Sequence, residues 1–221
     1  MKPLTMTTLK QHIAKSQVPE PTLRRLPWYL AYVTLLRHQG VQYVSSTAIS
    51  REINVDASQI AKDLSALQLR GKTRIGYDVD ALESSLRSFL GFDRQHNAVM
   101  IGVGSLGSAL IADRGLDRFG LNIVAGFDVN PAVVGTTLKN VAVFDVQRFE
   151  EISKAYGAEI AIIAVPVDHA QASADMAVAA GIKALWNFTP FRIRTADDTV
   201  IQNTSIYADL AVMYNRLKGG I

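Results

Sequence analysis

The sequence predicts an α/β protein, and three observations carry this prediction. A short apolar run at residues 98–101 precedes three glycines at the spacing G-x-G-x-x-G within residues 102–107. A second apolar run, residues 121–127, ends at the acidic Asp128. The order strand, glycine turn, helix, strand and acid is that of a Rossmann-type dinucleotide-binding unit with a doubly wound parallel sheet. The third observation is that helical periodicity and a modest excess of basic residues mark the chain before this unit.

Composition sets outer limits on the function. The chain has 221 residues, of which 48% are hydrophobic and 19% charged, as expected of a globular protein with a core. It has no cysteine, which excludes disulfides, thiol redox chemistry and Cys-ligated metals. The four histidines lack metal-ligand spacing, so we predict no metal site. No apolar run has the length of a membrane span and no signal peptide is evident, so we expect a cytoplasmic protein without a membrane partner.

Charge is unevenly distributed between the two halves. Residues 1–95 hold 13 Lys and Arg against 8 Asp and Glu, whereas residues 96–221 hold 10 against 12. A basic segment joined to a mildly acidic one suggests a nucleic-acid partner for the first half. The excess is modest, and chance is the alternative.

Residues 1–20 are polar with scattered prolines, and we expect a flexible arm there. A first helix should begin near Pro21 and end at Gly40, with Pro27 in or near its first turn, where a missing N–H costs little. A short helix is expected at residues 47–53. A third should be capped by Asp56, with Gln59 in a capping-box arrangement, and stopped by Gly71. Its Ile60, Leu64 and Leu67 form a buried stripe.

A basic, glycine-punctuated hairpin at residues 72–77 and a helix at residues 79–90 complete this domain. The order of elements is that of a winged helix-turn-helix, with the third helix in the major groove of DNA. The alternative is a small three-helix cap domain whose charged face is only solvated. The candidate DNA-binding residues are Ser46, Ser58, Gln59, Lys62, Lys72, Arg74 and Tyr77.

Each glycine of the loop has a predicted reason. Gly102 allows the tight turn, Gly104 lets the backbone approach a pyrophosphate, and Gly107 lets the following helix, residues 106–118, pack on the strand. Asp128, 21 positions after Gly107, suits both hydroxyls of an adenosine ribose and repels a 2′-phosphate. We therefore expect NAD(H) rather than NADP(H). The alternative is a structural glycine turn with a strand-end aspartate as a cap.

Further strands are expected at residues 141–144, 159–165, 182–186 and 200–201, with helices at 147–156 and 168–180. Strand ends of a doubly wound sheet face the nucleotide, and residues 187–189 are candidates for the nicotinamide end, although core packing is the simpler account of Phe188. The candidate cofactor-binding residues are Gly102, Val103, Gly104, Ser105, Leu106, Gly107, Asp128, Val129, Ala164, Val165, Pro166, Asn187, Phe188 and Thr189.

The last helix begins at Thr204 or Ser205 and is stopped by the glycines at 219–220. Its apolar face, formed by Ile206, Leu210, Met213, Tyr214 and Leu217, is broader than a terminal surface helix needs. A partner subunit would explain this face, and docking on the sheet of the same chain is the alternative. We therefore predict three parts: residues 1–91, 92–203 and 204–221.

Many short motifs follow one another in a fixed order along the chain, at residues 23–29, 62–65, 71–72, 76–77, 102–107, 127–128, 165–166, 170–171, 175, 180–183 and 187–190. Through these motifs the sequence resembles, from residue 22 to residue 217, the Rex family of redox-sensing transcriptional repressors. It implies a homodimer that binds operator DNA through winged helices and releases it when NADH accumulates. It also implies domain-swapped C-terminal helices, each between the two domains of the other subunit, and binding of NADH and NAD⁺ without hydride transfer.

Departures from the family pattern matter for specificity and signalling. Ala61 stands where members usually have an arginine, and losing such a contact removes about 1–3 kcal/mol of base discrimination. Two positions that usually hold a tyrosine and an aspartate are Asp113 and Thr204. Arg25 matches the family's signalling arginine, so we predict that Arg25 and Asp113 pair in one of two conformations, within or between subunits.

Two other functions compete with a redox-sensing repressor. An NAD-dependent dehydrogenase with an N-terminal cap should supply a general acid or base near the nicotinamide. The one histidine near a strand end is His169, which we interpret as a first-turn helix residue, so we predict no catalytic residue. A CoA-binding subunit is the third reading, because Rossmann-like CoA domains share the glycine turn.

Overall fold

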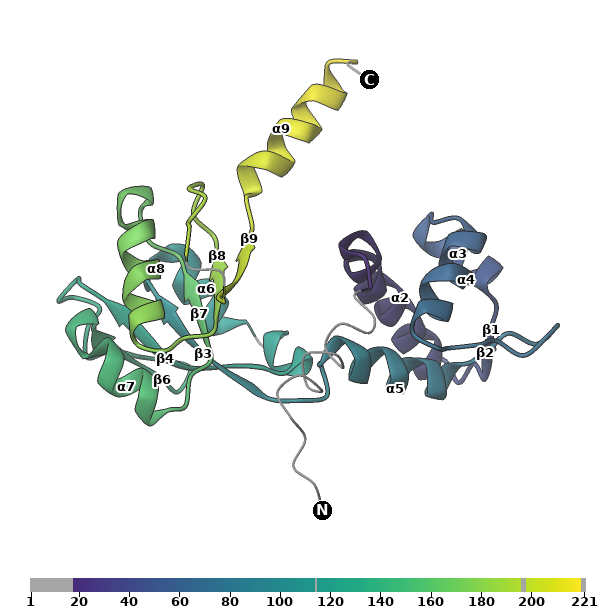
Figure 1. The fold of residues 1–221 in the computed structure, drawn as a ribbon, viewed down its shortest axis with the longest axis horizontal. Coiled ribbons are helices and arrows are strands. Elements are labelled where there is room, and N and C mark those ends of the chain that lie inside the picture. Colours follow the sequence, from purple (N-terminus) through teal and green to yellow (C-terminus); the bar gives the residue numbers. More distant parts are fainter. Residues whose placement is uncertain (1–17, 114, 196–197, 220–221) are drawn as a thin grey trace. The chain divides into compact units, whose positions relative to one another are not determined.

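The computed structural model describes residues 18–113, 115–195 and 198–219 (Figure 1). The chain divides into two compact units, residues 1–93 and 94–221. The arm predicted over residues 1–20 lies outside the described residues up to position 17. The last residue of the predicted arm, Glu20, already begins a helix that continues to His38.

The first unit is helical with a small hairpin. Its elements are α2 (Glu20–His38), β1 (Tyr43–Val44), α3 (Ser46–Ile53), α4 (Ala57–Ala66), β2 (Tyr77–Asp78) and α5 (Val79–Leu90). β1 and β2 pair antiparallel, with Tyr43 opposite Asp78. This is the predicted order of helix, short helix, turn, helix and wing.

Two helix boundaries in this unit differ from prediction. Pro27 lies inside α2 rather than in its first turn, where Pro21 stands instead. The missing N–H of Pro27 therefore costs α2 one internal bond, which burial of the neighbouring Leu26 and Leu30 offsets. Helix α4 ends at Ala66, not at Gly71, because Gln68 adopts a left-handed conformation with φ +62°.

The core of the first unit joins every one of its helices. Leu26, Tyr29, Leu30 and Val33 of α2 meet the inward faces of α3, α4 and α5. From α4 the predicted stripe residues Ile60 and Leu64 are fully buried, and Leu67 is partly buried. Burial of this stripe fixes which side of α4 faces outward.

The second unit is a seven-stranded sheet with helices. Its strands are β3 (His96–Ile101), β4 (Leu121–Asp128), β5 (Thr137–Leu138), β6 (Val141–Asp145), β7 (Ile160–Ile163), β8 (Ala184–Asn187) and β9 (Val200–Asn203). The order is β5-β6-β4-β3-β7-β8-β9, and all neighbours are parallel except the short edge pair β5 and β6. The predicted α/β class and Rossmann-type sheet are confirmed.

The helices of this unit are shorter than predicted. They are α6 (Ser105–Ala112), α7 (Phe149–Ala155), α8 (Ala170–Ala179) and α9 (Ile206–Leu217), with 3-10 turns η1 (Leu116–Phe119), η2 (Val146–Arg148) and η3 (Val167–His169). The helix predicted at 106–118 is wrong in its second half. It stops because Asp113 is extended, with ψ 133°, and its carboxylate accepts the N–H groups of Gly115 and Leu116. The edge strand β5 was not predicted.

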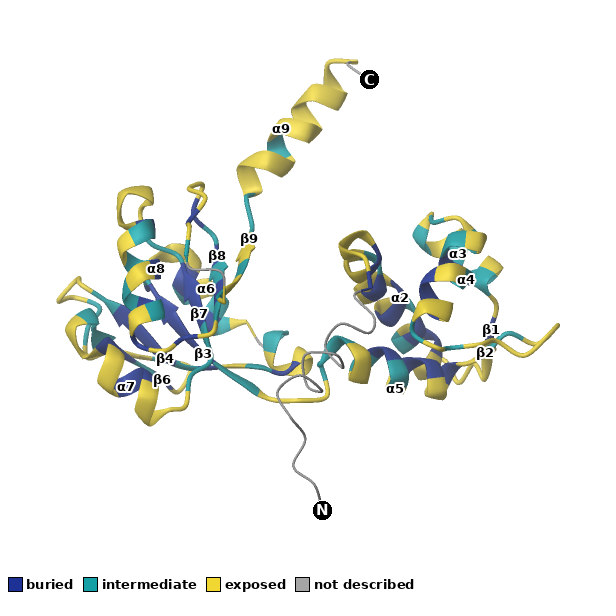
Figure 2. Cartoon of the chain, viewed as in Figure 1, coloured by how far each residue is buried: buried dark blue, intermediate teal, exposed yellow. Residues whose placement is uncertain are grey.

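Helix α9 differs from the others in its exposure. None of its residues, all of which are described, is buried, as the yellow helix at the C-terminus shows (Figure 2). Ile206 is 53% exposed and Leu217 78%. The apolar face predicted for this helix is therefore present, and its predicted exchange between subunits stays a prediction. Within the described residues, no helix combines the length and apolar character needed to span a bilayer.

The first testable prediction concerns close backbone packing at the glycine loop. A Cβ at position 107 would lie 2.0 Å from the backbone oxygen of Gly102, so Gly107→Ala must displace the loop. We expect this variant to lose about 1–3 kcal/mol of unfolding free energy. Gly104→Ala is the matched control, because nothing lies within 4 Å of its Cβ. Urea denaturation giving both variants the parent's stability would contradict the packing argument.

Candidate functional site

The carboxyl ends of β3, β4 and β7 form one edge of the sheet. β3 pairs with β4 on one side and with β7 on the other, so the chain reverses its direction of winding there. Such a switch point is where open α/β sheets bind ligands. A cavity of about 380 Å³ lies at this edge. Its lining residues are Ile101, Gly102, Gly104, Phe127, Asp128, Val129, Val146, Ala164, Val165, Pro166, His169, Ala172, Ser173 and Met176.

The glycine loop is held by contacts within the chain. Gly102 has φ +89°, and a Cβ there would lie 2.6 Å from the backbone oxygen of Ala164. The Gly102 N–H donates to the Phe127 carbonyl at 2.8 Å, which fixes the loop to the end of β4. Gly104, by contrast, borders open space. The loop is thus rigid at its base and leaves backbone accessible at the start of α6, as an anion site requires.

Asp128 is fixed at the end of β4 beside this loop. One carboxylate oxygen accepts the Val103 N–H at 2.7 Å, and the other accepts the Asn130 N–H at 2.9 Å. Each oxygen keeps a second lone pair, so the carboxylate can still accept from a ligand hydroxyl. Its negative charge and fixed orientation suit a ribose diol and disfavour a phosphate.

Of the predicted cofactor residues, the cavity brings together Gly102, Gly104, Asp128, Val129, Ala164, Val165 and Pro166. Val103, Ser105, Leu106 and Gly107 belong to the loop and the start of α6 but do not line the cavity.

Residues 187–189 do not line the cavity either. The buried Asn187 donates to the Phe191 carbonyl and to Asn203, and accepts from Thr189. Phe188 packs at 4.7 Å from the Trp186 ring. These polar groups brace the chain after β8, so their contact with a nicotinamide stays a prediction.

Sequence reasoning missed the far wall of the cavity. Val146 follows the strand β6, while Ala172, Ser173 and Met176 come from one face of α8. A signal for Val146 was available in the sequence, because Val146 also follows a strand end at the same edge of the sheet.

His169 lies in η3 as the N-cap residue of α8, ahead of the helix rather than in its first turn. Its imidazole is 3.7 Å from the Asp168 carboxylate, and both side chains are largely exposed.

The second candidate site is the outward side of α4 with the wing. Ser45 and Asp56 cap α3 and α4, and Asn54 turns the chain between them with φ +53°. Ser58 and Lys62 are exposed on α4, and Ser46 is partly exposed on α3. This is the helix-turn-helix that the spacing of caps and apolar residues predicts.

The wing tip presents its cations to solvent. Lys72 bridges to Gly76, and both Lys72 and Arg74 are exposed. Gly76 has φ +103°, and a Cβ there would meet the Val44 carbonyl at 2.4 Å, so this glycine allows the wing to pack on β1. Tyr77 is half-buried, and burial raises its pKa.

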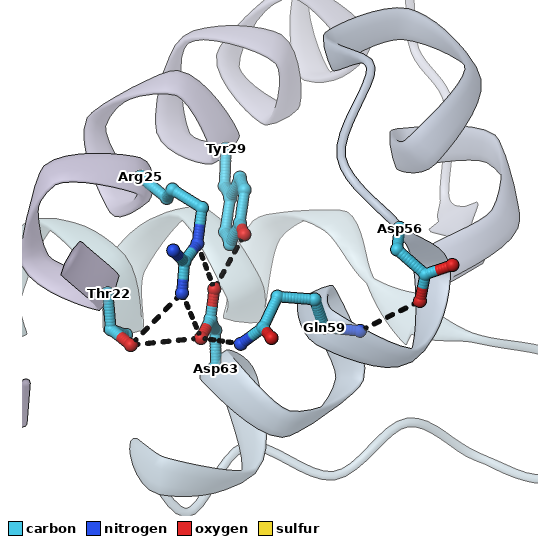
Figure 3. Close-up of polar contacts among 6 residues, drawn as sticks. All are labelled: Thr22, Arg25, Tyr29, Asp56, Gln59 and Asp63. Atoms are coloured by element: carbon cyan, nitrogen blue, oxygen red, sulfur yellow. Dashed lines mark hydrogen bonds and ion pairs between the residues drawn. The ribbon is translucent and has the colours of Figure 1, made fainter.

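A buried carboxylate joins α2 to α4 (Figure 3). Asp63 is 3% exposed and accepts hydrogen bonds from Thr22, Arg25, Tyr29 and Gln59. The Arg25 contacts are bidentate, at 2.7 and 2.8 Å. Burial acts to raise the pKa of Asp63, but these hydrogen bonds outweigh it and lower the pKa to about 2. Burial and the bond to Asp63 raise the pKa of Tyr29 to about 12.

This network contradicts one expectation, and a second one stays a prediction. The capping box is wrong, because Gln59 donates its side-chain amide to Asp63 at 2.9 Å instead of reaching back to the cap residue. Arg25 and Asp113 both have partners within their own units, namely Asp63 for Arg25 and the turn after α6 for Asp113. An Arg25–Asp113 pair stays a prediction.

The Asp63 network predicts an acid-dependent loss of stability. The pKa of Asp63 is lower in the folded chain than its ordinary 3.8, so its contribution is complete above about pH 5 and is lost as the pH falls toward 2. The contribution is on the order of 2 kcal/mol. Asp63→Asn should therefore differ from the parent most at pH 5–7 and least near pH 2. Urea denaturation across this range measures the difference, and parallel pH curves for the two proteins would contradict it.

Each of the two units matches a known protein family. Residues 17–65 match the family described as "Putative DNA-binding protein N-terminus", and residues 93–191 match "CoA binding domain". The redox-sensing transcriptional repressor Rex of Bacteroides fragilis is 58% identical over 214 residues, 97% of each chain. Its namesake from Bacteroides thetaiotaomicron is 56% identical over 207 residues, 94% of each chain.

Solved structures extend this likeness to the fold. The crystal structure of RSP with β-NAD⁺ and operator DNA is 35% identical, with a TM-score of 0.88 over 93% of this chain and 94% of that chain. RSP with β-NADH gives a TM-score of 0.83 at the same identity, over 93% of this chain and 96% of that chain. With identity above one half to curated relatives across nearly the whole sequence, the chain belongs to the Rex family of redox-sensing transcriptional repressors.

Proposed function

We propose that this chain is a DNA-binding repressor that senses the NADH/NAD⁺ ratio, with NADH binding releasing it from operator DNA. One observation carries the proposal: this chain combines a winged helix that exposes cations with a crevice at the switch point of its sheet. The chain is similar to RSP, whose structure has been solved with β-NAD⁺ and operator DNA and with β-NADH. A titration of labelled duplex from a palindromic promoter library, with and without NADH, tests it directly.

The crevice fits a dinucleotide. Gly104 leaves open space beside the exposed N–H groups that begin α6, which suits a pyrophosphate, while Asp128 would hold the adenosine ribose. Val129, Val165 and Pro166 would pack against the adenine. The bound group supplies a nicotinamide whose ring is positively charged when oxidised and neutral when reduced. The same Asp128 charge disfavours CoA, because the ribose of CoA carries a phosphate.

We propose that the protein transfers no hydride. His169 is the histidine at the crevice, and its nearest carboxylate, Asp168, is largely exposed at 3.7 Å. A general acid or base needs a partner that fixes its orientation, and this pair is solvated on both sides. The cofactor would then act as a ligand whose redox state is sensed.

DNA binding would use α4 and the wing. Ser58, Gln59 and Lys62 would face the major groove, with Ser46 near the backbone. Lys72, Arg74 and Tyr77 would contact the phosphates along the wing.

A second copy of the chain would cover α9. Its face of Ile206, Met213 and Leu217 is exposed along the whole helix, and a homodimer with exchanged C-terminal helices would bury it. A protein acting on operator DNA would reside in the cytoplasm.

Cofactor choice gives a testable prediction. Asp128→Ala should weaken NADH binding by roughly tenfold or more and narrow the preference over NADPH, because the ribose acceptor and the repelling charge leave together. The matched control is Asp145→Ala, since Asp145 ends the neighbouring strand in register with Asp128 but lies outside the cavity lining. Calorimetry showing parental NADH affinity for Asp128→Ala would remove this carboxylate from the site.

DNA contact gives another prediction. Lys62→Ala and Arg74→Ala should each weaken operator binding, with NADH affinity unchanged, and each should reduce the slope of log affinity against log salt by about 1 for every lost phosphate contact. Lys154→Ala removes the same charge from the nucleotide unit, where Lys154 pairs with Glu150, and should leave DNA binding unchanged. If both α4 and wing variants bind DNA like the parent, residues 45–77 are not the DNA-binding surface.

A further inference from the structure

Asp63 has one partner that sets it apart from an ordinary structural carboxylate. Three of its donors, Thr22, Arg25 and Tyr29, belong to α2 and hold the two helices together. The fourth is Gln59, one turn earlier on α4 itself and half-exposed beside the outward Ser58. Asp63 therefore contacts both the α2 side chains that hold the two helices together and a side chain on the outward side of α4.

Chemistry fixes the orientation of the Gln59 amide. An ionised carboxylate only accepts hydrogen bonds, so the nitrogen of the Gln59 amide must face Asp63 and its oxygen must face away. The low pKa keeps Asp63 ionised throughout the neutral range. Figure 3 shows the nitrogen of Gln59 directed at Asp63 and the oxygen turned from it. Gln59 therefore offers an acceptor and one remaining N–H in a fixed arrangement.

That arrangement matches one base edge in the major groove. Adenine presents an amino donor at N6 and an acceptor at N7, the pair that a glutamine oxygen and N–H can contact together. Guanine presents two acceptors there, and no donor for the glutamine oxygen.

We propose that Asp63 is a positioning residue for base recognition, holding Gln59 so that it reads an adenine in each operator half-site. The inference rests on the proposed function, because it needs α4 to enter the major groove. Asp63 itself does not touch DNA. Arg25 acts one step further away, by compensating the charge of Asp63 from α2.

The first unit contains a matched structural control. Glu83 on α5 is also a buried carboxylate, 2% exposed, with Thr34, Arg37 and Arg87 as partners. Burial acts to raise its pKa, but its partners outweigh it and lower the pKa, as for Asp63. Its hydrogen-bond and ion-pair partners lie on α2 and α5 and not on α4. Glu83→Gln therefore reproduces the loss of a buried charge without releasing a DNA-facing side chain.

The experiment uses the full chain and a duplex that the parent selects from a randomised palindromic library. Affinities are measured for this duplex and for a panel with one base pair changed symmetrically in each half-site. Gln59→Ala should lose discrimination at a single A·T position by on the order of tenfold. Asp63→Asn should lose it at the same position, because an asparagine offers both donor and acceptor and no longer fixes the amide. The double variant should show little further loss.

Three controls separate positioning from folding and from simple contact. Glu83→Gln should lower the melting temperature and keep the parental base preference. Lys72→Ala, on the wing that would contact the phosphates, should weaken all duplexes alike. Gln59→Glu leaves Asp63 and its α2 partners in place but sets two carboxylates against each other. It should also lose the adenine preference, and it decides the matter if Asp63→Asn does not fold.

Parental base preference in folded Asp63→Asn, or in Gln59→Ala, overturns the proposal. So does a loss in Asp63→Asn that is spread evenly over all positions, as in a merely destabilised protein. If the parent itself selects no duplex, the proposed function fails at that point. NADH affinity, measured in parallel, should stay at the parental value in every variant.

Discussion

The Asp63 carboxylate is the constraint on which the arrangement of the first unit depends. A charge that is 3% exposed is tolerated only when its lone pairs are filled, and four side chains fill them. Three of these donors stand on α2, at positions 22, 25 and 29, which share one face of that helix. The helix that carries the donors and the helix that carries the acceptor must therefore keep one relative position. Apolar packing alone, among core residues such as Leu26 and Ile60, would tolerate small shifts that this network does not.

A comparable constraint acts in the second unit, but through the absence of side chains. The start of α6 approaches β3 so closely that position 107 has no room for a Cβ, and position 102 is blocked by the chain after β7. Three segments, the ends of β3 and β7 and the start of α6, are locked together by these contacts. Gly104 has no such neighbour. The two crowded glycines build the loop, and the uncrowded one leaves the space that a ligand needs.

The sequence was most informative where one local rule decides the structure. Helix α5 spans the predicted residues 79–90, between Asp78 as N-cap and Gly91 as C-cap, and each long parallel strand lies on an apolar run. Prediction failed where a side chain had to choose between two partners that are both close in sequence. The spacing of Asp56 and Gln59 fits a capping box, but Asp63 is a stronger, charged acceptor for the same amide. Likewise Asp113 reads as a helical residue until its bonds to the turn at 115–116 are known.

The candidate crevice was predictable in part for the same reason. Gly102, Gly104 and Asp128 follow strand ends and belong to one motif, so a single pattern locates them. The lining residues from α8 could not be predicted in this way, because Ala172, Ser173 and Met176 have no distinctive chemistry. They reach the cavity only through the packing of α8 on the sheet. Asn187 and Thr189 show the converse: polar residues at a strand end whose hydrogen bonds are satisfied within the chain.

The two kinds of constraint together bear on how a cofactor signal reaches DNA. Among the described residues, each unit has its own buried core. Within the first unit, Asp63 ties α4 to α2, and a force on either helix moves both as one body. Under the proposed function, a ligand in the crevice would then change DNA contact by moving α2 and α4 together, in the manner of rigid-body switches, without rearranging the interior of the first unit. Under the same proposal, a second copy of the chain would cover the apolar face of α9, a helix in which no described residue is buried.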